Sequence, residues 1–194
     1  METFLSICVG LALAAACGFR VFVPLLVMSI ASLAGHLNLD PSFQWIGSYP
    51  ALITLSVATL LEILGYYIPW VDHLLDTIAT PAAVIAGIVV TASVLTDLSP
   101  FLQWTLAVIA GGGVAGIVQS ATVATRAAST SVSSGLTNPL VATAEAGLSF
   151  VTSFLVVVLP WLAIFVVSAL VIAGLLLWKK LWGWWRPAPK LHQG

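Results

Sequence analysis

Residues Phe150–Leu177 read FVTSFLVVVLPWLAIFVVSALVIAGLLL, a run in which no side chain carries a charge. A helix needs about 20 apolar residues to cross the ~30 Å hydrocarbon core of a bilayer, and this run is longer than that. Inside lipid, backbone N–H and C=O groups must be paired within the protein, which restricts spanning segments to helices and closed barrels. The apolar residues here are continuous rather than alternating. The stretch therefore predicts an all-α membrane protein.

The rest of the chain has the same character. Of its 194 residues, 60% are hydrophobic and 7% are charged, whereas a soluble domain carries roughly 25% charged residues. The length allows about five to six spans and no separate soluble domain. We expect a polytopic transmembrane helical bundle with broken or Pro-kinked helices, forming a single integral membrane domain over residues 1–186 and a cytoplasmic tail over 187–194.

Breaks in the apolar sequence place the elements. The first stretch is interrupted at Gly18-Phe19-Arg20 and Pro24, and its two helices form either a hairpin or one kinked pass. In the last stretch we expect one long helix kinked at Pro160, since a tight turn in lipid would leave backbone groups unpaired. A short interfacial segment is expected over 68–78, and polar connections over 36–48 and 127–138. The expected helices cover 3–17, 21–35, 50–67, 80–96, 101–126 and 140–177.

Basic residues predict the orientation. Four of the six Lys and Arg residues follow the final span, which predicts a cytoplasmic C-terminus in the cell (inner) membrane. Tryptophans beside them fit an interfacial belt. The N-terminal stretch begins Met1-Glu2 without Lys or Arg, so we interpret it as a retained helix rather than an export signal. No basic cluster precedes the tail, which argues against nucleic-acid binding. The tail residues in question are Lys179, Lys180, Arg186 and Lys190, with Trp178, Trp182, Trp184 and Trp185.

A few charges lie in apolar sequence. Outside the tail, the basic residues are Arg20 and Arg126, and Glu62 and Glu145 lie at similar depth. Each such charge costs about 2.5–3.5 kcal/mol at the bilayer centre on insertion scales. Two arginines and two glutamates permit electroneutral pairing, so we expect all four to converge inside the bundle. Structural ion bridges and a solute or ion site both fit, because breaking a buried pair is costly in either case.

The two arginines have similar surroundings. Gly10 precedes Arg20 by ten residues, and Gly116 precedes Arg126 by ten. Helix-breaking residues follow each arginine, a trait of transporters with internal repeats, so we predict candidate repeat halves 1–98 and 101–186. Freed backbone N–H groups and a guanidinium at such breaks could hold a carboxylate or phosphate. The predicted substrate-binding residues are Arg20, Glu62, Gln119, Arg126, Asn138 and Glu145.

Other signals are weaker. Asp72, His73 and Asp76 are either cation ligands or a solvated interfacial face, and we favour the solvated face. Cys8 and Cys17 sit in apolar sequence and are expected as buried thiols. The Gly112-x-x-x-Gly116 spacing predicts helix packing. No catalytic, phosphate-loop or metal-ligand motif is found, so we expect no cofactor, no metal site and no enzyme.

Several stretches resemble the bacterial and plastid membrane family known as domain of unknown function 4126. The resemblance covers about residues 5–150. Since that family has no assigned activity, it implies a membrane bundle and these candidate residues, but no reaction. Gly65, Tyr67, Gln119 and Ala144 depart from the pattern, where an acid, a lysine, a histidine and an acid are expected. The matching residues are Gly18-Phe19-Arg20 with Pro24, Glu62, Pro69, Val71, Asp72, Asp76, Thr80, Ala86-Gly87, Gly111–Gly116, Arg126, Ser134-Gly135, Asn138-Pro139, Thr143 and Glu145.

Two functions remain open from the sequence. The first is a small transporter, or carrier-like protein, in which Arg20 and Arg126 bind a small anionic or zwitterionic solute or a lipid headgroup. Its size of 194 residues is small for a transporter, which makes a homodimer plausible. The alternative is a non-catalytic membrane scaffold or assembly factor whose buried ion pairs are structural. A membrane-embedded enzyme ranks third.

Overall fold

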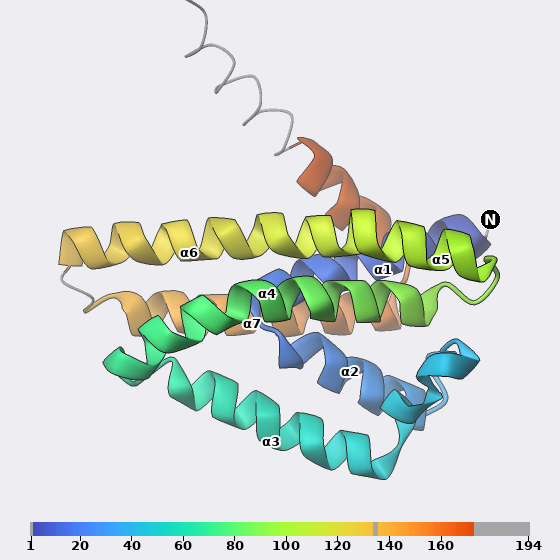
Figure 1. Ribbon diagram of the computed structural model, residues 1–194, viewed down its shortest axis with the longest axis horizontal. Helices are drawn as coiled ribbons and strands as arrows, with labels where there is room; N and C mark the ends of the chain where they lie inside the picture. Colours follow the sequence, from blue (N-terminus) through green and yellow to red (C-terminus); the bar gives the residue numbers. More distant parts are fainter. Residues whose placement is uncertain (1, 134–135, 173–194) are drawn as a thin grey trace, which may run out of the picture.

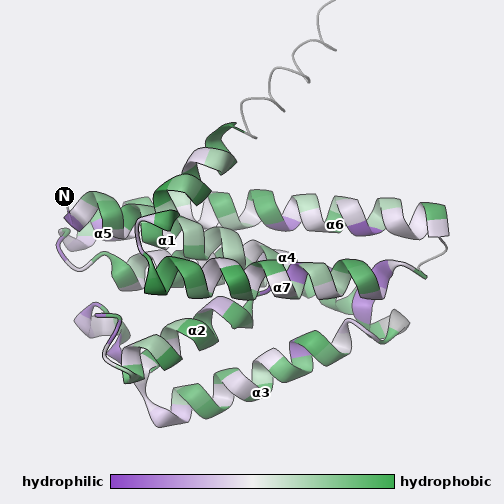
Figure 2. Ribbon diagram, turned by 180° about the vertical axis from the view of Figure 1, so that it is seen from behind, coloured by the Kyte–Doolittle hydropathy of each residue, from purple (hydrophilic) through white to green (hydrophobic). Residues whose placement is uncertain are grey.

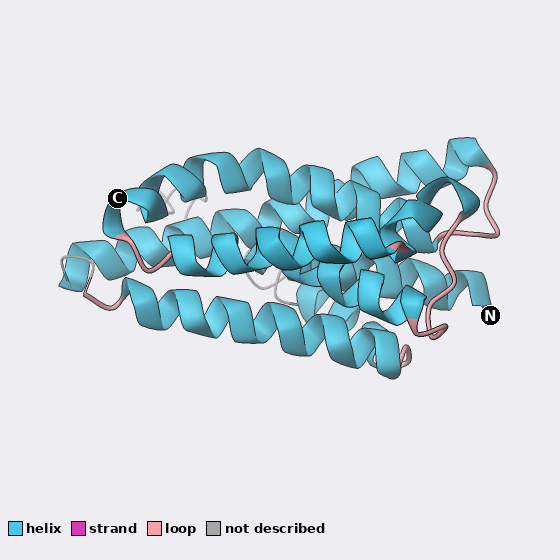
Figure 3. Ribbon diagram, turned by 90° about the horizontal axis from the view of Figure 1, so that it is seen from below, coloured by secondary structure: helices cyan, strands magenta, loops and turns pink. Residues whose placement is uncertain are grey.

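The computed structural model describes residues 2–133 and 136–172. Within these ranges every regular element is a helix (Figure 1, Figure 3), which confirms the all-α prediction. A further apolar helix, Leu162–Ile172, follows the labelled elements. The labelled elements are α1 (Glu2–Phe19), α2 (Phe22–Leu33), the 3-10 helix η1 (Pro41–Gly47), α3 (Tyr49–Gly65), α4 (Pro69–Val94), α5 (Pro100–Leu106), the π-helix η2 (Ala107–Gly112), α6 (Gly113–Ser133) and α7 (Asn138–Val158).

Four helical stretches among the described residues are long and apolar enough to cross a membrane. A fifth is added if η1 and α3, which meet at 64°, count as one broken span. Hydrophobic residues cover most of these helices (Figure 2), as expected for elements in contact with lipid. Four or five spans compare with the five to six predicted. The four continuous stretches are Glu2–Phe19, Leu74–Val94, Pro100–Ser133 and Asn138–Val158.

The first apolar stretch forms a hairpin. After the break at Arg20 and Val21, α2 runs back toward the end of the bundle where the chain begins (Figure 1). Glu2 and the segment 36–38 accordingly line the same pocket. Because the main chain reverses at this turn, Arg20 lies inside the bundle and not at its end.

Small residues make α1 the central helix. Ala12, Ala14 and Ala16 are fully buried, and so is Cys17, which confirms a buried free thiol there. At Gly18, an added Cβ would lie 2.7 Å from the carbonyl oxygen of Ala115 on α6. Such close approach is the usual role of small residues between membrane helices. Helices α4, α6 and α7 thus all pack directly on α1.

The glycine-rich segment packs as predicted. A Cβ added at Gly111 in η2 would lie 2.8 Å from the carbonyl oxygen of Gly87 in α4. Gly112 and Gly116 face Ile88 and Val84 of the same helix. The Gly112-x-x-x-Gly116 pattern is therefore a packing surface between α4 and the η2–α6 segment.

The single long helix predicted over 140–177 is wrong. Helix α7 ends at Val158, and a second helix starts at Leu162 after a turn at Pro160. Proline lacks an N–H and disfavours helical geometry at the residue before it, and Leu159 accordingly has ψ 77°. The turn leaves few unpaired groups because Leu162 N–H donates to Leu159 O and Ala163 N–H to Pro160 O, at 2.9 and 3.0 Å.

The polar connection predicted over 127–138 is helical in its first part, because α6 continues beyond Arg126 to Ser133. The segment predicted as interfacial over 68–78 is not a separate piece, since α4 begins at Pro69 and continues to Val94. Its place at the membrane interface stays a prediction. The basic and aromatic residues from 178 onward, on which the predicted orientation depends, lie outside the described residues, as does the proposed tail. The repeat halves stay a prediction.

Candidate functional site

Buried charges converge where the α1–α2 turn, the end of α3, the start of α4, the second half of α6 and the start of α7 meet (Figure 1). We call these residues the charged cluster. They come from all parts of the sequence between 20 and 145, so only the tertiary fold brings them together. The members are Arg20, Glu62, Tyr66, Asp72, Asp76, Arg126, Asn138 and Glu145.

Arg126 of α6 is paired through each of its three guanidinium nitrogens. Its Nε donates to both oxygens of Glu145, at 3.2 and 3.1 Å, and its Nη2 also donates to Glu145. Its Nη1 donates to Asp72 at 2.6 Å and to Asp76 at 3.3 Å. Fork-like pairing of this kind is the strong form of the arginine–carboxylate interaction. Arg126 therefore joins α4, α6 and α7.

Arg20 is the more deeply buried arginine, with 2% of its surface exposed. Its Nη2 donates to the backbone carbonyl of Ala142 at 2.8 Å and lies 3.4 Å from the carboxylate of Glu145. Its Nε and Nη1 are buried and have no hydrogen-bond partner among the described residues. Two of the three guanidinium nitrogens are thus unpaired within this part of the chain.

Tyr66, at the end of α3, contacts both arginines. The guanidinium carbons of Arg20 and Arg126 lie 3.8 and 3.9 Å from the centre of its ring. Such contacts stabilise a desolvated cation by about 2 kcal/mol or more. Tyr66 follows the end of α3, and its burial raises the pKa of the hydroxyl, which therefore stays neutral at physiological pH.

Glu62 of α3 caps the start of α2. Its carboxylate oxygens accept hydrogen bonds from the backbone N–H groups of Val21 at 2.7 Å and Phe22 at 3.0 Å. Those N–H groups have no partner within the helix, because they belong to its first turn. The positive end of the helix dipole favours a carboxylate at this position. Glu62 therefore caps the N-terminus of α2 with both oxygens of its carboxyl group.

Asn138 extends the cluster to the connection between α6 and α7. Its amide nitrogen donates to Asp72 at 3.2 Å and to the hydroxyl of Thr130 at 3.0 Å. Its amide oxygen accepts from Ser129 at 2.8 Å. Because Asn138 is the first residue of α7, these bonds fix the start of that helix against α4.

The cluster holds more acid than the sequence predicted. Asp72 is 4% exposed and paired with Arg126, so the expectation of a solvated face at Asp72 is wrong. The start of α4 packs against α6 there. The side chain of His73 lies outside the described residues. With four carboxylates against two guanidiniums, the cluster has a formal excess of two negative charges when all are ionised.

Five of the six residues predicted as a binding site meet in the cluster. Gln119 is buried on α6, but among the described residues no hydrogen bond joins it to the others. The sequence analysis did not predict Tyr66 as a member of the site. The one feature that could have indicated it is its position four residues after Glu62, a spacing that places two residues on the same face of a helix. It also left Asp72 and Asp76 out of the site, although they share one helical face.

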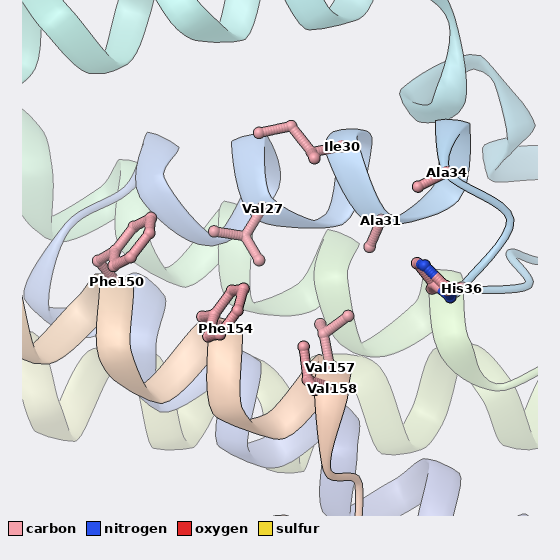
Figure 4. A pocket seen from close by; sticks show the side chains of 9 residues that line it. All are labelled: Val27, Ile30, Ala31, Ala34, His36, Phe150, Phe154, Val157 and Val158. Atoms are coloured by element: carbon pink, nitrogen blue, oxygen red, sulfur yellow. The ribbon is translucent and has the colours of Figure 1, made fainter.

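Two hollows of the described structure lie away from the cluster. An apolar groove of about 230 Å³ lies between α2 and α7, with Val27 facing Phe150 and Phe154 (Figure 4). A second hollow lies at the opposite end of the bundle, beside Glu2 and Asp97. Within the described parts of the chain, no three His, Cys, Asp or Glu side chains are arranged to hold a metal ion.

A family model described as domain of unknown function (DUF4126) matches residues 7–180. The chain belongs to this family. The match confirms the resemblance inferred from the sequence and includes every residue of the charged cluster. No curated protein and no solved structure matches the chain. For this member of the DUF4126 family, function must therefore be inferred from the cluster itself.

Proposed function

We propose that this DUF4126 protein is a small membrane carrier that binds the anionic group of a small solute, or of a lipid headgroup, at Arg20. The observation that supports it is the pair of buried, unpartnered nitrogens Nε and Nη1. Leaving a buried donor unsatisfied costs about 1–3 kcal/mol, and more when it is charged. A carboxylate or phosphate oxygen at these nitrogens would remove that cost.

In this proposal the two arginines have different roles. Arg126 already donates to carboxylates from all three nitrogens, so it holds α4, α6 and α7 in place. Arg20 provides the free donors and binds the solute. Glu145 contacts both arginines and balances part of their charge.

Of the two classes of solute, anionic and zwitterionic, a zwitterion fits the charge balance of the cluster better. The four acids of the cluster outnumber its arginines by two. Asp76 is the most accessible of its ion-paired acids, with 18% of its side chain exposed and a single 3.3 Å contact to Arg126. An amine of the solute near Asp76 would lower the electrostatic cost of burying that carboxylate. An anionic group of the same solute at Arg20 would do the same for the guanidinium.

The experiment uses the full chain reconstituted into liposomes. Uptake of radiolabelled amino acids, acetate and phosphate is compared for wild type, Arg20→Ala and Arg20→Lys, with Ser29→Ala as the control. Ser29 is buried and polar on α2 but lies outside the cluster. We expect Arg20→Ala to abolish uptake, Arg20→Lys to reduce it at least tenfold, and Ser29→Ala to leave it unchanged. Wild-type uptake by a folded Arg20→Ala variant would refute the proposal.

The complete pairing of Arg126 favours a second candidate, a scaffold or assembly factor in which the cluster only locks the helices. That candidate predicts that cellular function survives replacement of the paired residues by apolar ones of matched size. We further propose a homodimer in the inner cell membrane with a cytoplasmic C-terminus. Chemical crosslinking and accessibility labelling from either side test these two points.

A further inference from the structure

Glu62 occupies the position in which an external anion would bind. A carboxylate or phosphate at a helix N-terminus accepts hydrogen bonds from the first N–H groups, and Glu62 does so with Val21 and Phe22, at 2.7 and 3.0 Å. Glu62 belongs to α3, 40 positions further along the chain than Phe22. The N-terminus of α2 thus holds a carboxylate supplied by another helix.

The residue before Val21 is Arg20, and its charge is near enough to interact with that of Glu62. Its Nε and Nη1 are buried and, among the described residues, have no hydrogen-bond partner. Among the described residues no hydrogen bond or ion pair joins Arg20 to Glu62. The carboxylate of Glu62, which is held by its own helix, therefore accepts from the backbone N–H groups but not from the guanidinium nitrogens of Arg20. A free anion, which is not restrained by a side chain, could use both.

Helix α3 is attached to the bundle along one narrow stripe. It lies at the lower edge of the molecule beside α2 (Figure 1). Much of its remaining surface is exposed, including Leu60, Leu61 and Leu64. Near Glu62, the hydroxyl of Thr59 is buried without a partner. The end of α3 is held by the bonds from Glu62 to α2, by Tyr66 between the two arginines, and by a 2.7 Å hydrogen bond between the hydroxyls of Tyr67 and Thr143. Of these, only the bonds of Glu62 occupy the N-terminus of α2.

We propose that the anionic group of the solute, a carboxylate or a phosphate, binds at the N-terminus of α2 in exchange for Glu62. It would accept from the N–H groups of Val21 and Phe22 and from Nε and Nη1 of Arg20, while the side chain of Glu62 turns away and Tyr66 keeps its contacts with both arginines. This inference rests on the proposed function and names the site at which it would operate.

The charge of the cluster favours exchange over addition. With all four acids ionised the cluster has a formal excess of two negative charges, and a further anion in a medium of low dielectric constant would be strongly repelled. Replacing one carboxylate by another anion of the same charge leaves the total unchanged.

The experiment measures binding of acetate and inorganic phosphate to the full chain in detergent, from the shift in Tm with ligand concentration. Sodium chloride at equal ionic strength is the reference. In Glu62→Gln, a neutral amide competes less well for the N–H groups, so we expect the affinity for both anions to rise at least about tenfold. In Glu62→Asp, the charge is kept, but the shorter side chain reaches the N–H groups poorly, and a rise is again expected.

Asp76→Asn is the matched control, because it removes one negative charge from the cluster without vacating the α2 N-terminus. We expect it to raise the affinity much less than Glu62→Gln does. An equal rise in Asp76→Asn, or unchanged or lower affinity in both Glu62 variants, would overturn the exchange. If wild type still transports in an Arg20-dependent way, the proposed function survives that result. If no variant binds either anion and uptake does not depend on Arg20, the proposed function fails as well.

Discussion

The carboxylate of Glu145 bridges the two buried arginines. Its Oε2 lies 3.4 Å from Nη2 of Arg20 and also accepts from Nη2 of Arg126. The same side chain thereby connects the α1–α2 turn with α6 through α7. One carboxylate between two guanidiniums offsets part of their mutual repulsion, so the geometry of the whole cluster depends on Glu145.

Removal of this bridge is expected to destabilise the fold strongly. Glu145→Ala leaves the buried Arg20 without an ion-pair partner among the described residues and leaves Arg126 with only Asp72 and Asp76, which should cost about 3–5 kcal/mol in the free energy of unfolding. Unfolding of the detergent-solubilised protein by increasing SDS measures it. Asp97→Asn, at an exposed position of the loop after α4, should change stability by less than about 0.5 kcal/mol. Equal stability of the two variants would mean that the bridge is energetically unimportant.

The ring of Tyr66, rather than its hydroxyl, is expected to stabilise the arginines. Tyr66→Phe keeps both cation–π contacts and should leave Tm within a few degrees of wild type. Tyr66→Leu loses them and should cost about 2 kcal/mol or more, in addition to lost packing. Thermal unfolding followed by tryptophan fluorescence compares the two. A Phe variant as unstable as the Leu variant would show that the hydroxyl is what matters.

Close contact between α4 and η2 is expected to exclude a side chain at Gly111. Gly111→Ala places a Cβ 2.8 Å from the carbonyl oxygen of Gly87 and should cost about 1–3 kcal/mol through overpacking. The matched control is Gly113→Ala, where an added Cβ meets nothing within 4 Å. It should be neutral or stabilising by up to about 1 kcal/mol, because alanine favours a helix over glycine. The prediction is wrong if both variants unfold at the same SDS concentration.

Asn138 is expected to hold α7 to α4 through Asp72. Asn138→Ala removes the donor at 3.2 Å from Asp72 and leaves that buried carboxylate with one partner fewer, at a cost of about 1–3 kcal/mol. Asn138→Asp should be worse, because it places another negative charge beside Asp72. Hydrogen exchange at the start of α7 should accelerate in both variants. Unchanged hydrogen exchange at the start of α7 would show that Asn138 does not hold this helix to α4.

Sequence reasoning reached the fold class and most of the cluster for a simple reason. Hydrophobic continuity over a bilayer thickness dictates helices. A charge at that depth must find a partner, which points to the four residues Arg20, Glu62, Arg126 and Glu145. These inferences need only local sequence and the cost of burial.

Features that depend on tertiary position were not accessible in the same way. Two acids four residues apart, such as Asp72 and Asp76, have the same spacing on a solvated helix face as on a buried one. Only the position of Arg126 in the fold shows that this face is buried. The Ser- and Thr-rich segment after Arg126 has the composition of a loop, but Ser131 and Ser133 donate to the carbonyl oxygens four residues earlier, both at 2.8 Å. These bonds satisfy the hydroxyls within a continuous α6.

The break at Pro160 is a similar case. Whether a proline in lipid kinks a helix or ends it depends on whether the turn can pair its own backbone groups. Here the turn does so, through Leu159 and Pro160 as acceptors. Sequence composition gives no measure of that pairing.

The central claim is that Arg20, and not Arg126, has guanidinium nitrogens available to an external anion. ¹⁵N–¹H NMR of the arginine side chains measures this directly in the detergent-solubilised protein, with signals assigned by Arg20→Lys and titrated with acetate and phosphate against sodium chloride. The account predicts a saturable shift of the Arg20 Nε–H signal and at most a small change at Arg126. No shift at Arg20, or a larger one at Arg126, would contradict it.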